Sequence, residues 1–150
     1  MIRDDIKTAT ITAMKAQDSV RLGTLRLISA ALKNKDIELR TGVAPADDDV
    51  LVADVLSKMA KQRRESIDMF VKGGRPELAD AERGELGVIE GFMPTQMAAG
   101  EAQAAVRALV AELGATSVKD MGRVMAAVRE RFAGQLDTGS ASAMVKAALG

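Results

Sequence analysis

The stretch SVKDMGRVM at residues 117–125 combines the start of a helix with a glycine set between two methionines. Ser117 is placed to cap the first turn, and Asp120, three residues later, favours the positive end of the helix dipole. Gly122 is less favourable in a helix than alanine by about 1 kcal/mol, so we expect another backbone or a ligand to approach closely there. The stretch therefore predicts a closely packed helical bundle.

The composition of the whole chain favours an all-α fold. Hydrophobic residues make up 47% of the 150 residues and charged residues 28%, which is typical of a globular chain and not of a disordered one. Only three residues are aromatic, and the other apolar residues are chiefly Ala, Leu, Val and Met, which favour helices over strands. The length suits one ordinary domain or two small ones.

Several classes of chemistry are excluded by the residue types that the chain lacks. It has no cysteine and no histidine. Disulfides, thiolate nucleophiles and cysteine-based zinc sites are therefore ruled out, and the commonest metal ligand and general base is absent. The sequence also contains no EF-hand spacing and no phosphate-binding loop. We assign no catalytic residue, no metal and no cofactor from the sequence.

Apolar spacing and turn residues divide the chain into two helical domains. Asp18 is placed to cap a long second helix, and Pro76 suits the first turn of a fourth. A proline within residues 93–97 indicates a hinge there. The predicted fold is all-α, with a four-helix domain of long antiparallel helices at residues 1–94 and a small three-helix bundle at residues 95–150. The expected helices cover residues 3–16, 19–40, 48–71 and 76–93, then 99–113, 118–132 and a short segment capped by Asp137.

Arg63 interrupts the apolar face of the third predicted helix. Steps of four residues from Met59 to Ile67 land on it, so a guanidinium occupies an expected core position. A cation near a buried seam needs a partner, and Glu82 and Glu85 on the next helix offer two carboxylates one turn apart. We expect Arg63 to pair with one of them. The cluster is interpreted as a structural ion pair or, alternatively, as part of a substrate-binding site.

Four cations in the second predicted domain are candidates for contact with RNA phosphates. The net charge of the chain is zero and no dense basic patch is present, so any such contact is expected to be local. Two of the four are one turn apart and share a helical face, although cations on a plain solubilising surface need no function. The four residues are Lys119, Arg123, Arg129 and Lys146.

Five segments, in order along the chain, resemble the GatB/YqeY family of small stand-alone proteins. They are residues 18–32, KQRRESI at 61–67, Glu82 with Glu85, FMP at 92–94 and KDMGRVM at 119–125. The resemblance covers nearly the whole chain. The C-terminal part is similar to the helical tail of the B subunit of the glutamine-dependent aspartyl/glutamyl-tRNA amidotransferase, which is implicated in holding tRNA. This similarity implies a tRNA-facing domain that contains Lys119, Gly122, Arg123 and Lys146.

The family resemblance implies a tRNA-associated helical accessory protein, related to carbon-nitrogen ligases that use glutamine as amido-N-donor. The catalytic cradle of the full subunit is too long to fit in this chain, so no complete active site is expected. The implied partners are tRNA and an amidotransferase or another protein, and the implied source is bacterial. Two alternatives stay open: a protein-interaction module that binds no RNA, and an enzyme that uses the cluster around Arg63.

The sequence carries no sign of export or of a membrane span. The N-terminus lacks an apolar signal-peptide segment, and no charge-free apolar run approaches the roughly 20 residues that span a bilayer. We therefore expect a cytoplasmic chain with no membrane partner.

Overall fold

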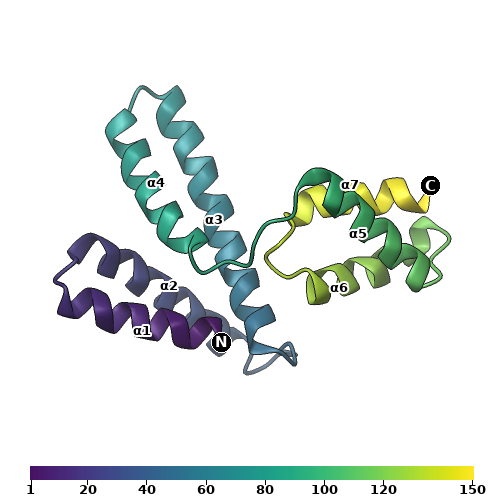
Figure 1. The fold of residues 1–150 in the computed structure, drawn as a ribbon, viewed down its shortest axis with the longest axis horizontal. Coiled ribbons are helices and arrows are strands. Elements are labelled where there is room, and N and C mark those ends of the chain that lie inside the picture. Colours follow the sequence, from purple (N-terminus) through teal and green to yellow (C-terminus); the bar gives the residue numbers. More distant parts are fainter. The chain divides into compact units, whose positions relative to one another are not determined.

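The computed structural model is all-α, as the composition predicts (Figure 1). It describes residues 1–150 apart from the side chain of residue 138. Within this described part the chain forms seven α-helices, one short 3-10 helix and no strand. None of the described helices has both the length and the apolar character needed to cross a membrane. The helices are α1 (Ile2–Lys15), α2 (Ser19–Glu38), α3 (Asp48–Lys72), α4 (Pro76–Glu90), α5 (Ala99–Glu112), η1 (Val118–Asp120, the 3-10 helix), α6 (Met121–Arg131) and α7 (Thr138–Leu149).

The helices gather into two compact units, Met1–Met93 and Pro94–Gly150. The first unit holds α1 to α4, and the second holds α5, η1, α6 and α7. Each unit has its own core of buried apolar side chains. Because two separate cores hold the chain together, each unit is described by itself.

The N-terminal unit consists of two helical hairpins, α1 with α2 and α3 with α4 (Figure 1). The most extensive helix pairing in this unit is between α3 and α4. A short turn joins these two, which favours antiparallel neighbours. The buried residues of α3 all lie at 51–60, so its second half runs out of the core. The largest buried side chains of this core are Ile6, Leu25, Ile28, Val52, Leu56 and Ile89.

Local signals set the helix boundaries of the N-terminal unit. The Asp18 carboxylate accepts a hydrogen bond from the Arg21 amide at 3.1 Å, which confirms the predicted cap of α2. Pro76 occupies the first turn of α4, as predicted, where its missing N–H costs no helical hydrogen bond. Gly74, in the turn before it, has φ of +69°, a left-handed conformation that favours glycine.

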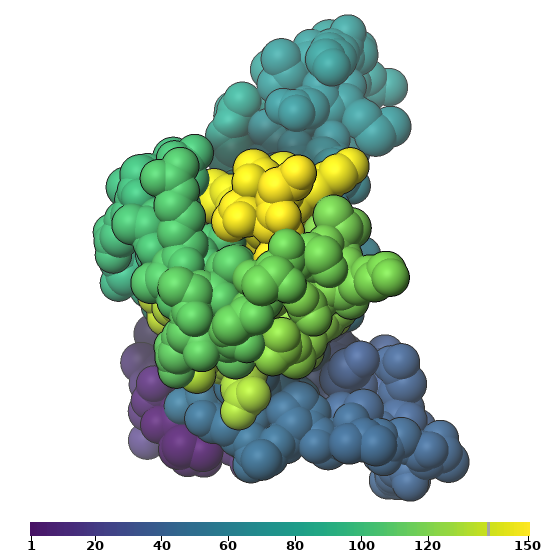
Figure 2. Space-filling view, turned by 90° about the vertical axis from the view of Figure 1, so that its right-hand side faces the viewer, coloured from purple at the N-terminus to yellow at the C-terminus, as the bar shows by residue number. Residues whose placement is uncertain are grey.

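The C-terminal unit is a bundle of α5, α6 and α7 around a second apolar core. In Figure 2, α7 reaches the surface of this unit between α5 and α6. Gly114 follows the end of α5 with φ of +64°, a left-handed conformation that favours glycine, and the Asp137 carboxylate accepts a hydrogen bond from the Ser140 amide at the start of α7. The core contains Val106, Leu109, Val124, Met125, Val128 and Val145.

The segment that precedes α5 is fastened to the same unit. The Met97 amide donates a hydrogen bond to the Gln135 carbonyl at 3.0 Å, and the side-chain amide of Gln96 donates to the Gly134 carbonyl. These bonds hold the residues just after Pro94 against the loop between α6 and α7. The end of the segment predicted as a hinge is therefore tied down within the C-terminal unit.

The stretch at residues 117–125 differs from its prediction in two ways. Ser117 makes no side-chain cap; the Asp120 carboxylate accepts from the Thr116 amide at 3.0 Å, and a 3-10 turn precedes α6. Gly122 is exposed, and a Cβ placed there would meet nothing within 4 Å. The expected close approach of another backbone is thus wrong for the described chain, because this glycine lies on the solvent side of α6.

Candidate nucleic-acid interface

Three of the predicted RNA-contact residues are exposed cations on three different elements of the C-terminal unit. Lys119 lies in η1, Arg129 in the last turn of α6 and Lys146 in the last turn of α7. None of them forms an ion pair with any side chain that the structure describes. Their charges are therefore available to an anion from outside the chain.

Arg123, the fourth predicted cation, is already engaged within the unit. Its Nη1 donates to the Leu113 carbonyl at 2.9 Å, and its Nη2 lies 3.4 Å from an Asp120 carboxylate oxygen. The Leu113 carbonyl ends α5, where helix carbonyls lack partners in their own helix. Arg123 thus joins the end of α5 to the start of α6. The sequence does not show this role, because it depends on how the loop between the helices folds back.

The same region fixes the charge of Asp120. The Thr116 amide that donates to this carboxylate lowers the pKa of Asp120, and the Ser117 amide and Arg123 lower it further. The 3-10 turn also changes the geometry expected for Lys119 and Arg123. With three residues per turn in place of 3.6, a spacing of four residues no longer aligns two side chains as it does in an α-helix.

A bidentate ion pair that sequence reasoning missed joins α5 to α6. Arg131 Nη1 and Nη2 lie 2.5 and 2.8 Å from the two carboxylate oxygens of Glu112. This pairing lowers the pKa of Glu112 and raises that of Arg131. The partners are 19 residues apart in the chain, so no helical spacing could signal the contact. Arg131 is therefore a bridge between helices, whereas Arg129 has no such partner among the described side chains.

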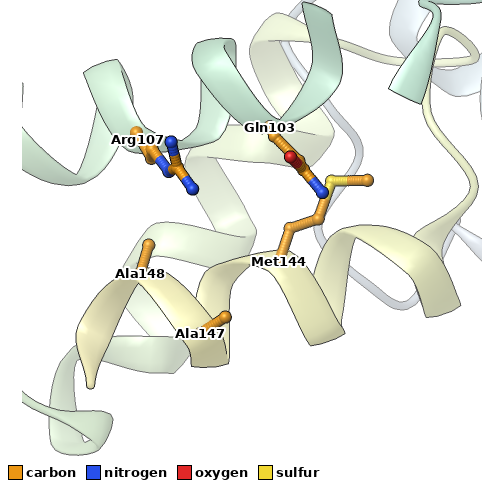
Figure 3. Close-up of a pocket in the computed structure, with 5 residues that line it drawn as sticks. All are labelled: Gln103, Arg107, Met144, Ala147 and Ala148. Carbon is orange, nitrogen blue, oxygen red and sulfur yellow. The ribbon is translucent and has the colours of Figure 1, made fainter. Parts of the chain in front are cut away.

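A groove between α5 and α7 contains a further exposed cation of the C-terminal unit. Arg107 and Gln103 extend from α5 toward α7, whose small side chains leave the space open (Figure 3). The groove has a volume of about 100 Å³. Arg107 forms no ion pair within the described part of the chain, and sequence reasoning did not single it out. The groove is completed by Met144, Ala147 and Ala148.

The structure brings together the three residues of the predicted ion-pair cluster in the N-terminal unit. Arg63 Nε on α3 lies 2.6 Å from Glu85 Oε2 and 3.3 Å from Glu82 Oε2 on α4. The Arg63 side chain is 18% exposed. Glu82 Oε2 is buried and accepts no hydrogen bond from the described residues, although it lies within ion-pair distance of the guanidinium. The cluster sits where α3 leaves the core, which suits a clamp between two helices.

The exposed cations of the C-terminal unit suit anion binding, because lysine and arginine side chains bind phosphate directly. Among the described residues, no group of three or more His, Cys, Asp or Glu is placed to hold a metal ion.

Comparison with known proteins places the chain in a family. The model of a family described as "Yqey-like protein" matches residues 3–149. A protein of Eremothecium gossypii, named "Altered inheritance of mitochondria protein 41, mitochondrial", is 37% identical over 107 residues, which cover 71% of this chain and 55% of the relative. The protein of the same name from Lachancea thermotolerans is 32% identical over 114 residues, or 75% of this chain and 57% of the relative. The chain spans about half the length of the curated relatives it matches.

These relatives correct one expectation and leave others without support. Their names describe mitochondrial proteins of yeasts, which contradicts the expected cytoplasmic location. That expectation failed because the absence of a span or signal segment excludes some locations without identifying one. The names mention neither tRNA nor an amidotransferase, and they do not support a bacterial source. What the comparisons establish is the family: over residues 3–149 the chain belongs to the YqeY-like, or GatB/YqeY, family.

Proposed function

We propose that the chain is a helical accessory protein that binds tRNA through its C-terminal unit. The observation that carries the proposal is the set of exposed cations without an ion pair to any described side chain: Lys119, Arg129 and Lys146. They belong to the part of the sequence that resembles the tail of an amidotransferase B subunit. A tRNA backbone presents phosphates, and exposed lysine and arginine side chains neutralise them.

The proposed role is to hold or deliver tRNA and not to transform it. The family resemblance relates the chain to glutamine-dependent tRNA amidotransferases, which are carbon-nitrogen ligases. We expect no complete active site of that kind in this chain, so it would act beside an amidotransferase or another protein partner. We further propose that its two units are independent domains, a four-helix domain and a three-helix bundle that offers the tRNA surface.

The contacts within the C-terminal unit refine which residues carry the proposed interaction. Arg123 is bound to the Leu113 carbonyl and to Asp120, so it contributes chiefly to the fold. Arg107, in the groove between α5 and α7, joins the candidate set because it is exposed and has no described ion-pair partner. Gly122 leaves open space on the surface, which would let a nucleic-acid backbone approach α6.

Charge reversal on the C-terminal unit tests the proposal. The variant Lys119→Glu/Arg129→Glu/Lys146→Glu should bind tRNA at least about tenfold more weakly than the original chain at 100 mM salt, an estimate from the loss of phosphate contacts. Fluorescence anisotropy of labelled tRNA measures the affinity, and far-UV circular dichroism checks that the helices are kept.

A matched control places the same charge change on the other unit. Lys15, Lys61 and Lys72 are exposed and form no ion pair with a described side chain. Their replacement by Glu should change tRNA affinity by less than about threefold, since only long-range electrostatics are altered. Equal losses in the two triple variants would show that the C-terminal unit has no special role.

The runner-up function is a protein-interaction module that binds no RNA. Exposed apolar side chains on the N-terminal unit favour it, among them Val20 and Met69, which are 78% and 73% exposed. This function predicts no tRNA binding even at 50 mM salt, where phosphate contacts are stronger than at 200 mM. A titration with tRNA at 50 mM salt separates the two functions.

A further inference from the structure

Helix α2 carries a second apolar face that the other described helices of the N-terminal unit leave exposed. Val20 is 78% exposed, and Leu27 and Ile37 are each 46% exposed. The residues between them on the same side of the helix are exposed as well. We call this face the α2 stripe; it consists of Val20, Gly23, Leu27, Ala30, Asn34 and Ile37.

The α2 stripe is separate from the face by which α2 joins its own core. Leu25, Ile28 and Leu32 are buried in that core. At about 100° per residue, the stripe lies well round the helix from those three side chains. Its members are spaced alternately by three and four residues, which is the pattern of the a and d positions of a coiled coil. The stripe therefore has the spacing needed to pack against another helix.

Two residues within the α2 stripe suit a helical partner. A Cβ at Gly23 would meet nothing within 4 Å, so no contact within the chain accounts for a glycine in the middle of this helix. Small residues such as Gly23 and Ala30 let a second backbone come close, and Asn34 lies at an a-type position, where one polar residue fixes the register. The stripe thus offers both close approach and a register signal.

A row of cations borders one side of the α2 stripe. Arg26 and Lys33 are seven residues apart in α2, so they lie along a line beside the stripe, and Arg40 follows in the turn just after the helix ends at Glu38. All three are exposed, and none forms an ion pair with a side chain that the structure describes. On the other border Glu38 is the one carboxylate, and it lies 3.7 Å from Lys35. A complementary partner would carry acidic residues along its flank.

From this charge pattern we infer that the α2 stripe binds an amphipathic helix of a partner protein that has an apolar seam and an acidic flank. A second copy of the chain fits less well, because an antiparallel pair would set the basic row against itself and a parallel pair would offer it a single carboxylate. The stripe spans 18 residues, or about 26 Å, enough for a partner helix of five turns. The inference is independent of the tRNA proposal, since α2 lies in the other unit.

A designed peptide provides a defined probe for the full chain. It is a helix of about three heptads with leucine at a and d and glutamate at the flanking positions, and a second version carries lysine at those positions. The acidic peptide should bind at least about tenfold more tightly than the basic one, because only the acidic flank complements the basic row. Isothermal titration measures the affinities, and amide chemical shifts locate the bound peptide.

Variants of the α2 stripe and a matched control assign the binding face. Leu27→Glu/Ile37→Glu should weaken binding of the acidic peptide at least about tenfold, because charge enters the apolar seam. The control Met69→Glu/Val71→Glu alters two exposed apolar residues near the end of α3 and should leave the affinity within about twofold. Circular dichroism and thermal midpoints check that both variants fold.

Reversal of the basic row completes the test. Arg26→Glu/Lys33→Glu/Arg40→Glu should exchange the preference, so that the lysine-flanked peptide becomes the tighter ligand. The inference is overturned if neither peptide binds, if the two bind equally, or if the chemical shifts fall outside α2. Self-association of the chain through the stripe would also overturn it.

Discussion

The seams of the N-terminal unit and the surface of the C-terminal unit use their cations in opposite ways. Arg3 and Arg63 lie partly buried between helices, and each is bound by two carboxylates. Lys119, Arg129 and Lys146 are exposed and have no ion-pair partner among the described side chains. Charges of the first kind hold helices together, whereas charges of the second kind contribute little to the fold and are open to an outside ligand.

Arg3 shows how much structure one guanidinium can organise. It donates to Asp36, at the end of α2, at 3.0 and 3.1 Å, and to Asp48, at the start of α3, at 2.9 and 3.0 Å. Three helices are thereby linked through one side chain near the start of α1. The difference between the two regions shows that the ion-pair partners and the burial of a cation indicate its role better than its residue type does.

Removal of Arg63 should have the largest effect on stability. Arg63→Met leaves Glu82 and Glu85 close together without their cation, and we expect a loss of about 2 kcal/mol in the free energy of unfolding. Urea denaturation measures it. Neutralising both carboxylates as well, with Glu82→Gln and Glu85→Gln, should recover part of the loss. Arg83→Met, at an exposed pair with Asp80, is the control and should cost less than about 0.5 kcal/mol.

If Arg63→Met has the stability of the original chain, Arg63 does not hold α3 and α4 together. The difference between stabilising cations in the N-terminal unit and unpaired cations in the C-terminal unit would then be lost. The cluster would then be open again to its alternative interpretation as a binding site. The variant Arg63→Met/Glu82→Gln/Glu85→Gln separates the effect of the two unpaired carboxylates from the effect of methionine itself, because it keeps Met at position 63 and removes both carboxylates.

Arg3→Met should cost less, about 1 to 2 kcal/mol, because Asp36 and Asp48 are more exposed than the Arg63 partners. It should also change the response to acid. The hydrogen bonds from Arg3 lower the pKa of Asp48 below its unfolded value of 3.8. The resulting stability is present above pH 3.8 and is lost as the pH falls through the lower folded pKa.

The acid response gives a second readout of the Arg3 link. As the pH falls below 3.8, the original chain should lose stability and Arg3→Met should lose less, since the Asp48 pKa returns toward 3.8 in the variant. Thermal unfolding at pH 2, 3, 4 and 6 gives the comparison. Parallel pH profiles for the two chains would exclude Arg3 as the cause of the Asp48 shift.

Gly122→Ala should have the smallest effect on stability, and one of opposite sign. A Cβ at this position meets nothing within 4 Å, so alanine should stabilise α6 by about 0.5 to 1 kcal/mol. Gly114→Ala is the matched control, because its φ of +64° makes alanine unfavourable there. Stabilisation at Gly122 combined with weaker tRNA binding would indicate that the glycine keeps space for the ligand. A loss of stability would mean that the surface of α6 is not free.

The boundaries of the helices could be predicted from the sequence because their causes are local. Asp18 and Asp137 accept hydrogen bonds from amides three residues away, and Gly114 takes the left-handed conformation that few other residues accept. The pairing of Arg63 was also foreseeable, because a cation on an apolar face requires a carboxylate nearby. Each of these inferences uses residues of one helix and its cap, or of two helices that follow one another in the chain.

The remaining features depend on how distant segments meet. Arg123 bonds to a carbonyl at the end of another helix, and its role follows from the loop between them. The open space at Gly122 could not be predicted from the sequence. The sequence shows that a glycine stands in a helix, but it does not show what surrounds that glycine. The α2 stripe was not predicted from the sequence, because the apolar face with Leu25, Ile28 and Leu32 is enough to explain how α2 packs in its own core.

The dependence of tRNA affinity on salt tests the central claim most directly, namely that the exposed cations of the C-terminal unit are free to bind phosphate. With about four phosphate contacts, from Arg107, Lys119, Arg129 and Lys146, a plot of log affinity against log salt concentration should have a slope of about −3 to −4 for the original chain. The Lys119→Glu/Arg129→Glu/Lys146→Glu variant, which keeps Arg107, should bind weakly with a slope of about −1. An original chain that binds no tRNA, or a variant with the same affinity and slope, would contradict the account.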